Sequence, residues 1–212
     1  MRPSPALLSR GKRWHAAIGR PVVLAAITRE GEEAELMREW GSIQGQRPFL
    51  IVVPRHPQRF DEVEALLVAS GLRVARRRTW GETPSVEALK VDAWLGDSLG
   101  EMPQYYASSD VALLGGSFMA LGGHNLIEAA ACGCPLVMGP STFNFSEAAA
   151  LSLAAGASLQ VADMDAGIVE VQRLLESPER LAALSRAALS FAAQHRGAAA
   201  RMAQRIVPLM RG

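Results

Sequence analysis

The sequence predicts an α/β fold in which a doubly wound, mostly parallel sheet is followed by C-terminal helices. Short apolar runs without alternation recur as far as Ala162, and such runs are typical of strands covered on both faces. Helical patterns separate these runs, and only helical patterns rich in Ala, Leu and Arg follow them. A chain of 212 residues with 49% apolar residues can bury the core that such a sheet requires.

The first residues of the chain do not look like part of this sheet. Residues 1–20 contain Pro, Arg and Lys without a clear period, so we expect a linker or lead-in there. Regular structure is expected from Pro21 onward. Residues 21–212 are therefore interpreted as one domain, which includes C-terminal helices from about residue 163.

The strands are expected at the apolar runs, which Gly, Pro or polar residues bound. Phe49–Val53, for example, lies between two prolines. In chain order the expected strands are Val22–Ile27, Phe49–Val53, Leu72–Ala75, Val91–Leu95, Val111–Leu114, Pro135–Met138 and Leu159–Val161.

The helices are expected where apolar residues recur at helical spacing. Glutamates that begin at Glu32 suit the positive end of a helix dipole, and Gly71 and Gly133 are typical residues at which helices end. The expected helices are Glu32–Trp40, Asp61–Ser70, Gly100–Ser108, one from about Asn125 that stops at Gly133, Asp163–Glu176, Pro178–His195 and Gly197–Met210.

Composition excludes several classes of protein. A net charge of +1 argues against a dedicated nucleic-acid binder. Cys132 and Cys134 are one residue apart and have no second pair, which favours reduced core residues over a metal site. No apolar run approaches the ~18 residues that a membrane-spanning helix needs, and no secretory signal is expected.

Ligands of open parallel sheets bind beyond the carboxyl ends of the strands. Two glycine pairs, Gly115-Gly116 and Gly122-Gly123, form a loop directly after the strand Val111–Leu114. A glycine-rich loop between a strand and a helix aims backbone N–H groups at an anion. We therefore expect a ligand at this edge, one that carries phosphate, although the loop lacks the G-x-G-x-x-G dinucleotide pattern.

Two other strand exits carry candidate binding residues. Pro54 and Arg55 follow the second strand, where Arg55 either binds a phosphate or pairs with a surface carboxylate. Gly100, Glu101 and Met102 open a short helix, where free N–H groups either face a ligand or belong to a plain turn in which Glu101 satisfies the helix dipole.

The helix after the glycine loop begins with Asn125 and Glu128, which are three residues apart. This spacing is that of a capping box, with Asn125 as the N-cap. The Glu128 carboxylate could instead accept hydrogen bonds from a ribose diol. His124 beside them could donate to a phosphate, and the spacing leaves these alternatives open.

Several motifs together resemble one known family. They are REGEE (29–33), PRHPQRF (54–60), LGDSLGEMPQYYASSDVALLGGS (95–117), GGHNLIEAAACGCPLVMGPSTFNF (122–145) and HRGAAAR (195–201). From about Pro21 to its end, the chain resembles the C-terminal half of 3-deoxy-D-manno-octulosonic acid (Kdo) transferase. That bacterial enzyme transfers Kdo from CMP-Kdo to a lipid A precursor during lipopolysaccharide assembly.

The resemblance implies one half of a GT-B fold, which consists of two Rossmann-like domains that face each other across a cleft. It implies that the donor CMP-Kdo binds this half, with no metal and no cofactor. The contacts to CMP would come from Pro54 and Arg55, from Gly100, Glu101 and Met102, and from Asn125, Leu126, Ile127 and Glu128.

The resemblance places the general base, the acceptor groove and the membrane anchor in an N-terminal domain, so we name no catalytic residue here. It further implies association with that acceptor-binding half, and a cytoplasmic location, peripheral at the bacterial inner membrane. Ile27 stands where the family usually has serine, and Ala120 where it often has proline. A nucleotide-binding module without transfer activity, and the donor domain of a UDP-sugar transferase, are the alternatives.

Overall fold

The computed structural model describes the backbone of residues 2–209 and the side chains of residues 2–195. Its centre is a seven-stranded sheet in which every neighbouring pair of strands is parallel, in the order β3-β4-β2-β1-β5-β6-β7. The strands are β1 (Val22–Thr28), β2 (Phe49–Pro54), β3 (Val74–Arg76), β4 (Ala93–Leu95), β5 (Val111–Leu114), β6 (Leu136–Met138) and β7 (Leu159–Gln160). The predicted α/β fold class is confirmed.

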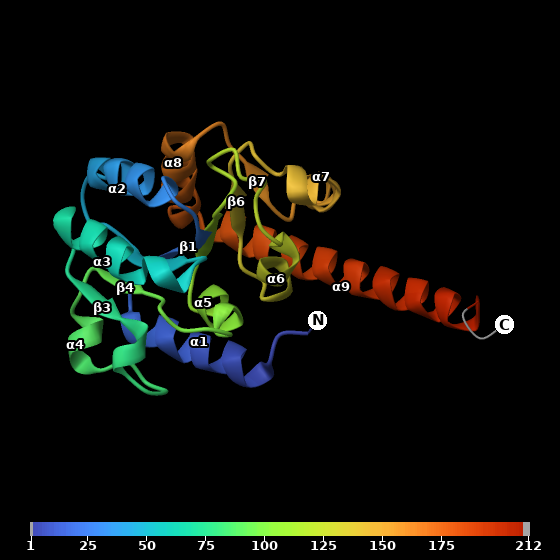
Figure 1. Cartoon of the computed structure of the whole chain (residues 1–212), viewed down its shortest axis with the longest axis horizontal. Coiled ribbons are helices and arrows are strands. Elements are labelled where there is room, and N and C mark those ends of the chain that lie inside the picture. The colour runs from blue at the N-terminus through green and yellow to red at the C-terminus, as the bar shows by residue number, and fades with distance from the viewer. Residues whose placement is uncertain (1, 210–212) are drawn as a thin grey trace.

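Helices cover both faces of this sheet (Figure 1). The α-helices are α1 (Pro5–Ile18), α2 (Glu32–Ser42), α3 (Phe60–Ala69), α4 (Val86–Leu89), α5 (Met102–Ala107), α6 (Leu126–Ala131), α7 (Ser146–Ala154), α8 (Met164–Leu175) and α9 (Pro178–Leu209). Short 3₁₀ turns lie at Pro57–Arg59, Arg77–Thr79 and Phe143–Phe145.

The core has two parts, one on each face of the sheet. Leu24 of β1 packs with residues of α1, α4, α5, α6 and α9. Val23, the preceding residue, packs on the opposite face with residues of α2, α3 and α8. Because successive side chains of a strand point to opposite faces, a strand between two helical layers must be apolar throughout. This is why β2 is buried along its whole length and why its sequence shows no alternation.

Two predictions for the ends of the chain were wrong. Residues 1–20, expected as a linker or lead-in, contain helix α1, whose Gly11 and Trp14 are buried against the domain. The segments Pro178–His195 and Gly197–Met210, expected as two helices, belong to the single helix α9, and Met210 lies outside the described residues. One interior glycine costs a helix only about 1 kcal/mol, which does not force a break.

The strand order places the candidate residues near one another. The chain runs outward from β1 to β2, continues through β3 and β4, and returns to β5 on the other side of β1. The sheet therefore has a topological switch point between β1 and β5, where ligands of doubly wound sheets bind. The exits of β4, β2, β1 and β5 follow one another along this edge.

Candidate functional site

A cavity of about 590 Å³ opens between the exits of β4 and β5. Pockets for small ligands usually measure about 300–1,000 Å³. Its lining includes five residues that the sequence predicted for the site: Gly100, Met102, Asn125, Ile127 and Glu128. The remaining lining residues are Pro103 of α5, Ala131 of α6, and Arg2, Pro3, Ser4 and Leu7 at the start of the chain.

Asn125 and Glu128 form only half of the predicted capping box. The Asn125 side-chain oxygen accepts a hydrogen bond from the N–H of Ile127 at 3.0 Å, so Asn125 is the N-cap of α6. The half-buried Glu128 carboxylate has no hydrogen-bond partner among the described residues, and burial raises its pKa. An unpaired, partly desolvated carboxylate in a cavity is suited to accept hydrogen bonds from hydroxyl groups of a ligand.

The Glu101 side chain holds the loop before α5 in place. It accepts a hydrogen bond from the Arg77 guanidinium at 2.9 Å and another from the Ser98 hydroxyl. Arg10 of α1 lies 3.8 Å from the same carboxylate. Glu101 is therefore an anchor for Gly100 and Met102, which line the cavity beside it.

Arg77 itself lies against two aromatic rings that meet edge to face. Its guanidinium carbon lies 4.8 Å from the ring centre of Trp14 and 5.6 Å from that of Trp80. Cation–π contact with a desolvated guanidinium contributes up to about 2 kcal/mol. The loop at Gly100 is thus tied through Glu101 and Arg77 to the aromatic core under α1.

Ser98 lies in a G-x-S-x-G pentapeptide, Gly96–Gly100, which is the spacing of the nucleophile elbow in serine hydrolases. In this structure the Ser98 hydroxyl hydrogen-bonds to Glu101 and to the Tyr105 hydroxyl. No histidine within the described part of the chain hydrogen-bonds to it, so it lacks the base that would activate a serine. We interpret Ser98 as part of the anchor.

The other candidate residues lie outside this cavity lining. Pro54 is the buried last residue of β2, and Leu126 is buried in the core. Arg55 is exposed, and its N–H donates to the Thr28 carbonyl at 2.9 Å, which joins the exits of β2 and β1. Its guanidinium pairs with no carboxylate in the described part of the chain, so the alternative of a surface ion pair finds no support.

His124 packs against the glycine loop. Its ring lies against Gly116, where an added Cβ would be 3.3 Å from ring atoms Cδ2 and Nε2. Burial, together with the positive charges of Arg55, Arg29 and His56, lowers the pKa of His124 to about 4. The imidazole is therefore neutral near pH 7.

Glu32 fixes the glycine loop, a role that the sequence analysis missed. This buried carboxylate accepts hydrogen bonds from three backbone amides: Arg29 at 2.9 Å, Gly116 at 2.8 Å and Phe118 at 3.1 Å. It thereby joins the exit of β1 to the loop after β5. Gly115 makes the same junction possible, because a Cβ there would lie 2.3 Å from the Ile27 carbonyl oxygen.

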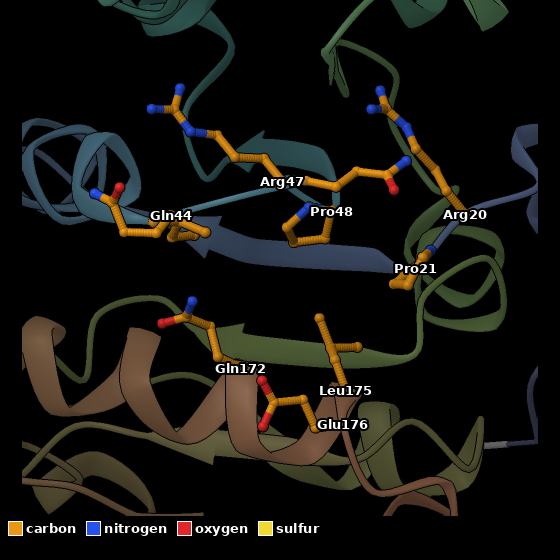
Figure 2. A pocket seen from close by; sticks show the side chains of 10 residues that line it. Arg20, Pro21, Gln44, Arg47, Pro48, Gln172, Leu175 and Glu176 are labelled. Atoms are coloured by element: carbon orange, nitrogen blue, oxygen red, sulfur yellow. The ribbon is translucent and has the colours of Figure 1, made fainter.

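A second cavity, of about 260 Å³, lies at the opposite edge of the sheet, by the starts of β1 and β2 (Figure 2). Arg20, Arg47, Gln172 and Glu176 are among its lining residues. It contains none of the predicted site residues, and its arginines are held by backbone carbonyls of Val91 and Gly41. We do not associate it with the candidate site.

Among the described residues, no group of three or more His, Cys, Asp or Glu side chains has the geometry to hold a metal ion. Within the same part of the chain, no helix combines the length and the apolar character that crossing a membrane requires.

Residues 56–206 match the family described as glycosyl transferase-like. The solved C-terminal CMP-Kdo binding domain of WaaA from Acinetobacter baumannii is 30% identical, with a TM-score of 0.79 over 89% of this chain and 98% of that domain. The chain belongs to the Kdo transferase family, as its C-terminal GT-B domain. The Kdo transferase of Bordetella pertussis is 47% identical over 92% of this chain, and that of Haemophilus influenzae is 34% identical over 90%.

The chain spans less than half the length of these Kdo transferases: 46% of the Bordetella protein and 44% of the Haemophilus protein. A more distant structure, Anabaena HepE in complex with UDP-glucose, is 15% identical with a TM-score of 0.64. That likeness shows the fold alone. It covers 49% of HepE, as expected for one half of a GT-B protein.

Proposed function

We propose that this chain is the donor-binding half of a transferase that moves Kdo from CMP-Kdo to a lipid A precursor in lipopolysaccharide biosynthesis. The observation that carries the proposal is the cavity in which Gly100, Met102, Asn125, Ile127 and Glu128 meet. The similarity to the solved CMP-Kdo binding domain of WaaA supports CMP-Kdo as the ligand.

In this proposal the nucleoside of the donor occupies the cavity. Glu128 accepts hydrogen bonds from the ribose diol, and the Gly100–Met102 loop and residues Asn125–Ile127 form the walls around the nucleotide. Pro54 ends β2 so that Arg55 follows at the sheet edge, where its guanidinium contacts the phosphate. Glu101 supports the site by anchoring the Gly100–Met102 loop, and Leu126 supports it from the core.

The chemistry proposed for this half is stabilisation of the leaving group. When the bond from the sugar to the phosphate breaks, CMP leaves as a phosphate monoester and gains negative charge. In this proposal Arg55, which directly follows β2, stabilises that charge. Our proposal requires neither metal nor cofactor. It assigns the general base and the lipid A precursor to an acceptor-binding half, with the whole enzyme cytoplasmic and peripheral at the inner membrane.

Calorimetric titration with CMP and UDP tests the donor assignment. We expect CMP to bind more tightly, and Glu128→Ala to weaken CMP binding by about 1–3 kcal/mol, the usual loss for a charged hydrogen-bonding group. Glu147→Ala is the matched control, because Glu147 is an exposed carboxylate in the first turn of α7, outside the cavity. Tighter binding of UDP than of CMP would overturn the donor assignment. Equal affinities of the two variants for CMP would overturn the proposed contact of Glu128 with the ribose.

Transfer activity needs a separate test. Adding an acceptor-binding half from the Bordetella relative to this chain, with CMP-Kdo and lipid A precursor, should restore Kdo transfer. Binding of CMP without transfer in that mixture would instead indicate a nucleotide-binding module without catalytic function.

A further inference from the structure

A group of basic side chains lies at the exits of β1, β2 and β5. Its members are Arg29, Arg55 and His124, and the two arginines are close enough for their charges to act on His124. Backbone contacts hold these exits together: the Arg55 N–H donates to the Thr28 carbonyl, and Glu32 Oε2 accepts from the N–H groups of both Arg29 and Gly116. These bonds fix the backbone at Arg29 and Arg55 relative to the glycine loop.

The charges of the two arginines in this group are not compensated within the described part of the chain. Arg59, Arg76 and Arg77 each pair with carboxylates. Arg29 and Arg55 form no ion pair there, although Arg29 is half-buried. Two guanidinium groups without counter-charges, next to a ligand cavity, favour the binding of an anion.

His124 provides a second, independent observation. Its Nε2 atom is buried and has no hydrogen-bond partner among the described residues. Leaving such an atom unpaired is unfavourable, so a ligand group that bonds to it gains affinity. His124 directly precedes Asn125, which lines the nucleotide cavity. The basic group and the cavity are thus neighbouring parts of one site.

We propose that Arg29 and His124 bind a carboxylate on the sugar of the donor, while Arg55 binds its phosphate. This inference depends on the proposed function and adds a selectivity to it. A nucleotide-linked sugar acid carries one charge on the phosphodiester and one on the sugar, which two separate guanidinium groups can match. Arginine pairs with carboxylates through two parallel hydrogen bonds, so a neutral sugar would leave Arg29 unpaired.

Calorimetric titrations of the full 212-residue chain with CMP and with CMP-Kdo test the proposal. Arg29→Gln should weaken CMP-Kdo binding by about 10- to 100-fold. It should change CMP binding by no more than about two-fold, since CMP lacks the sugar carboxylate. His124→Phe, which keeps a ring over Gly116 and removes the polar atoms, should show the same pattern.

Arg47→Gln is the matched control, because Arg47 is an exposed arginine at the opposite edge of the sheet (Figure 2). It should leave both affinities unchanged. Thermal melting verifies that each variant is folded. If Arg29→Gln unfolds, Arg29→Lys replaces it, because lysine keeps the positive charge but cannot form the two parallel hydrogen bonds of a guanidinium.

The outcomes separate this inference from the proposed function. Equal weakening of CMP and CMP-Kdo by Arg29→Gln would place Arg29 on the phosphate and overturn the carboxylate assignment alone. Unchanged binding of both ligands would overturn it as well. Failure of the unaltered chain to bind either ligand would overturn the proposed function together with this inference.

Discussion

Removal of the Glu32 side chain should release the glycine loop from the exit of β1. In Glu32→Ala, two buried amides and the part-buried amide of Arg29 lose the acceptor that lies 2.8–3.1 Å from them in the unaltered protein. Each buried donor left without a partner costs about 1–3 kcal/mol, so the two buried amides together cost about 2–6 kcal/mol and the Arg29 amide adds a smaller loss. Part of this is offset, because the carboxylate no longer has to be buried, and burial raises the pKa of Glu32. We expect a net loss of about 3–5 kcal/mol in the free energy of unfolding.

Urea unfolding measures this loss, and hydrogen exchange of the Gly116 and Phe118 amides shows where it occurs. Glu35→Ala is the control, because Glu35 also lies in the first turn of α2 and there contributes only a helix-dipole term of about 0.3–1 kcal/mol. The loss of stability in Glu32→Gln should lie between those of Glu32→Ala and Glu35→Ala, since one backbone amide then faces an NH₂ group instead of an acceptor. If Glu32→Ala and Glu35→Ala cost the same and exchange at Gly116 is unchanged, Glu32 does not hold the loop.

Three further predictions concern the support of the site. Arg77→Met leaves the Glu101 carboxylate without its closest cation and should cost about 3 kcal/mol in urea unfolding. Gly11→Val places a Cβ 2.3 Å from a carbonyl oxygen of α5, so it should displace α1 and cost about 1–3 kcal/mol, measured by calorimetric melting. The hydrogen bond to Asp110 raises the pKa of His15 above 6.5. The unaltered protein should therefore be more stable than His15→Gln below about pH 6, and this difference should disappear as the pH rises through the raised pKa. Melting temperatures measured across this pH range would show it.

The strands could be predicted because burial on both faces leaves an unambiguous pattern. Phe49–Val53 became β2 with one residue added, and Val111–Leu114 is β5 with the predicted bounds. The predicted bounds of short edge strands were less accurate. The strand expected at Leu72–Ala75 lies at Val74–Arg76, where the residues are only half-buried. The positions of strand exits, and hence the candidate residues, followed from the same pattern.

Helix α1 could not be recognised from local preference because tertiary contacts stabilise it. Its inward face consists of the buried Gly11 and Trp14 and the half-buried Leu7 and Ile18, which are spaced by four, three and four residues in chain order. Only three of these are apolar side chains, and the fourth is a glycine that allows close approach to α5. The spacing was the available signal, but a glycine on the buried face does not count as apolar in a periodicity argument.

The role of Glu32 was hidden for a related reason. A glutamate in the first turn of a helix satisfies the helix dipole, and this local explanation is sufficient for the sequence. Its actual partners, Gly116 and Phe118, are more than eighty residues away in the chain. Contacts of such separation depend on the strand order, in which β1 and β5 are neighbours.

The position of Arg77 beside two indole rings gives the protein an intrinsic fluorescent reporter. Because Arg77 also holds Glu101, any movement of the Gly100–Met102 loop changes the charge beside Trp14 and Trp80. Indole emission responds to nearby charge, so intrinsic fluorescence should register occupation of the cavity without an attached dye. The emission of the same rings should not change when a ligand binds at the opposite edge of the sheet.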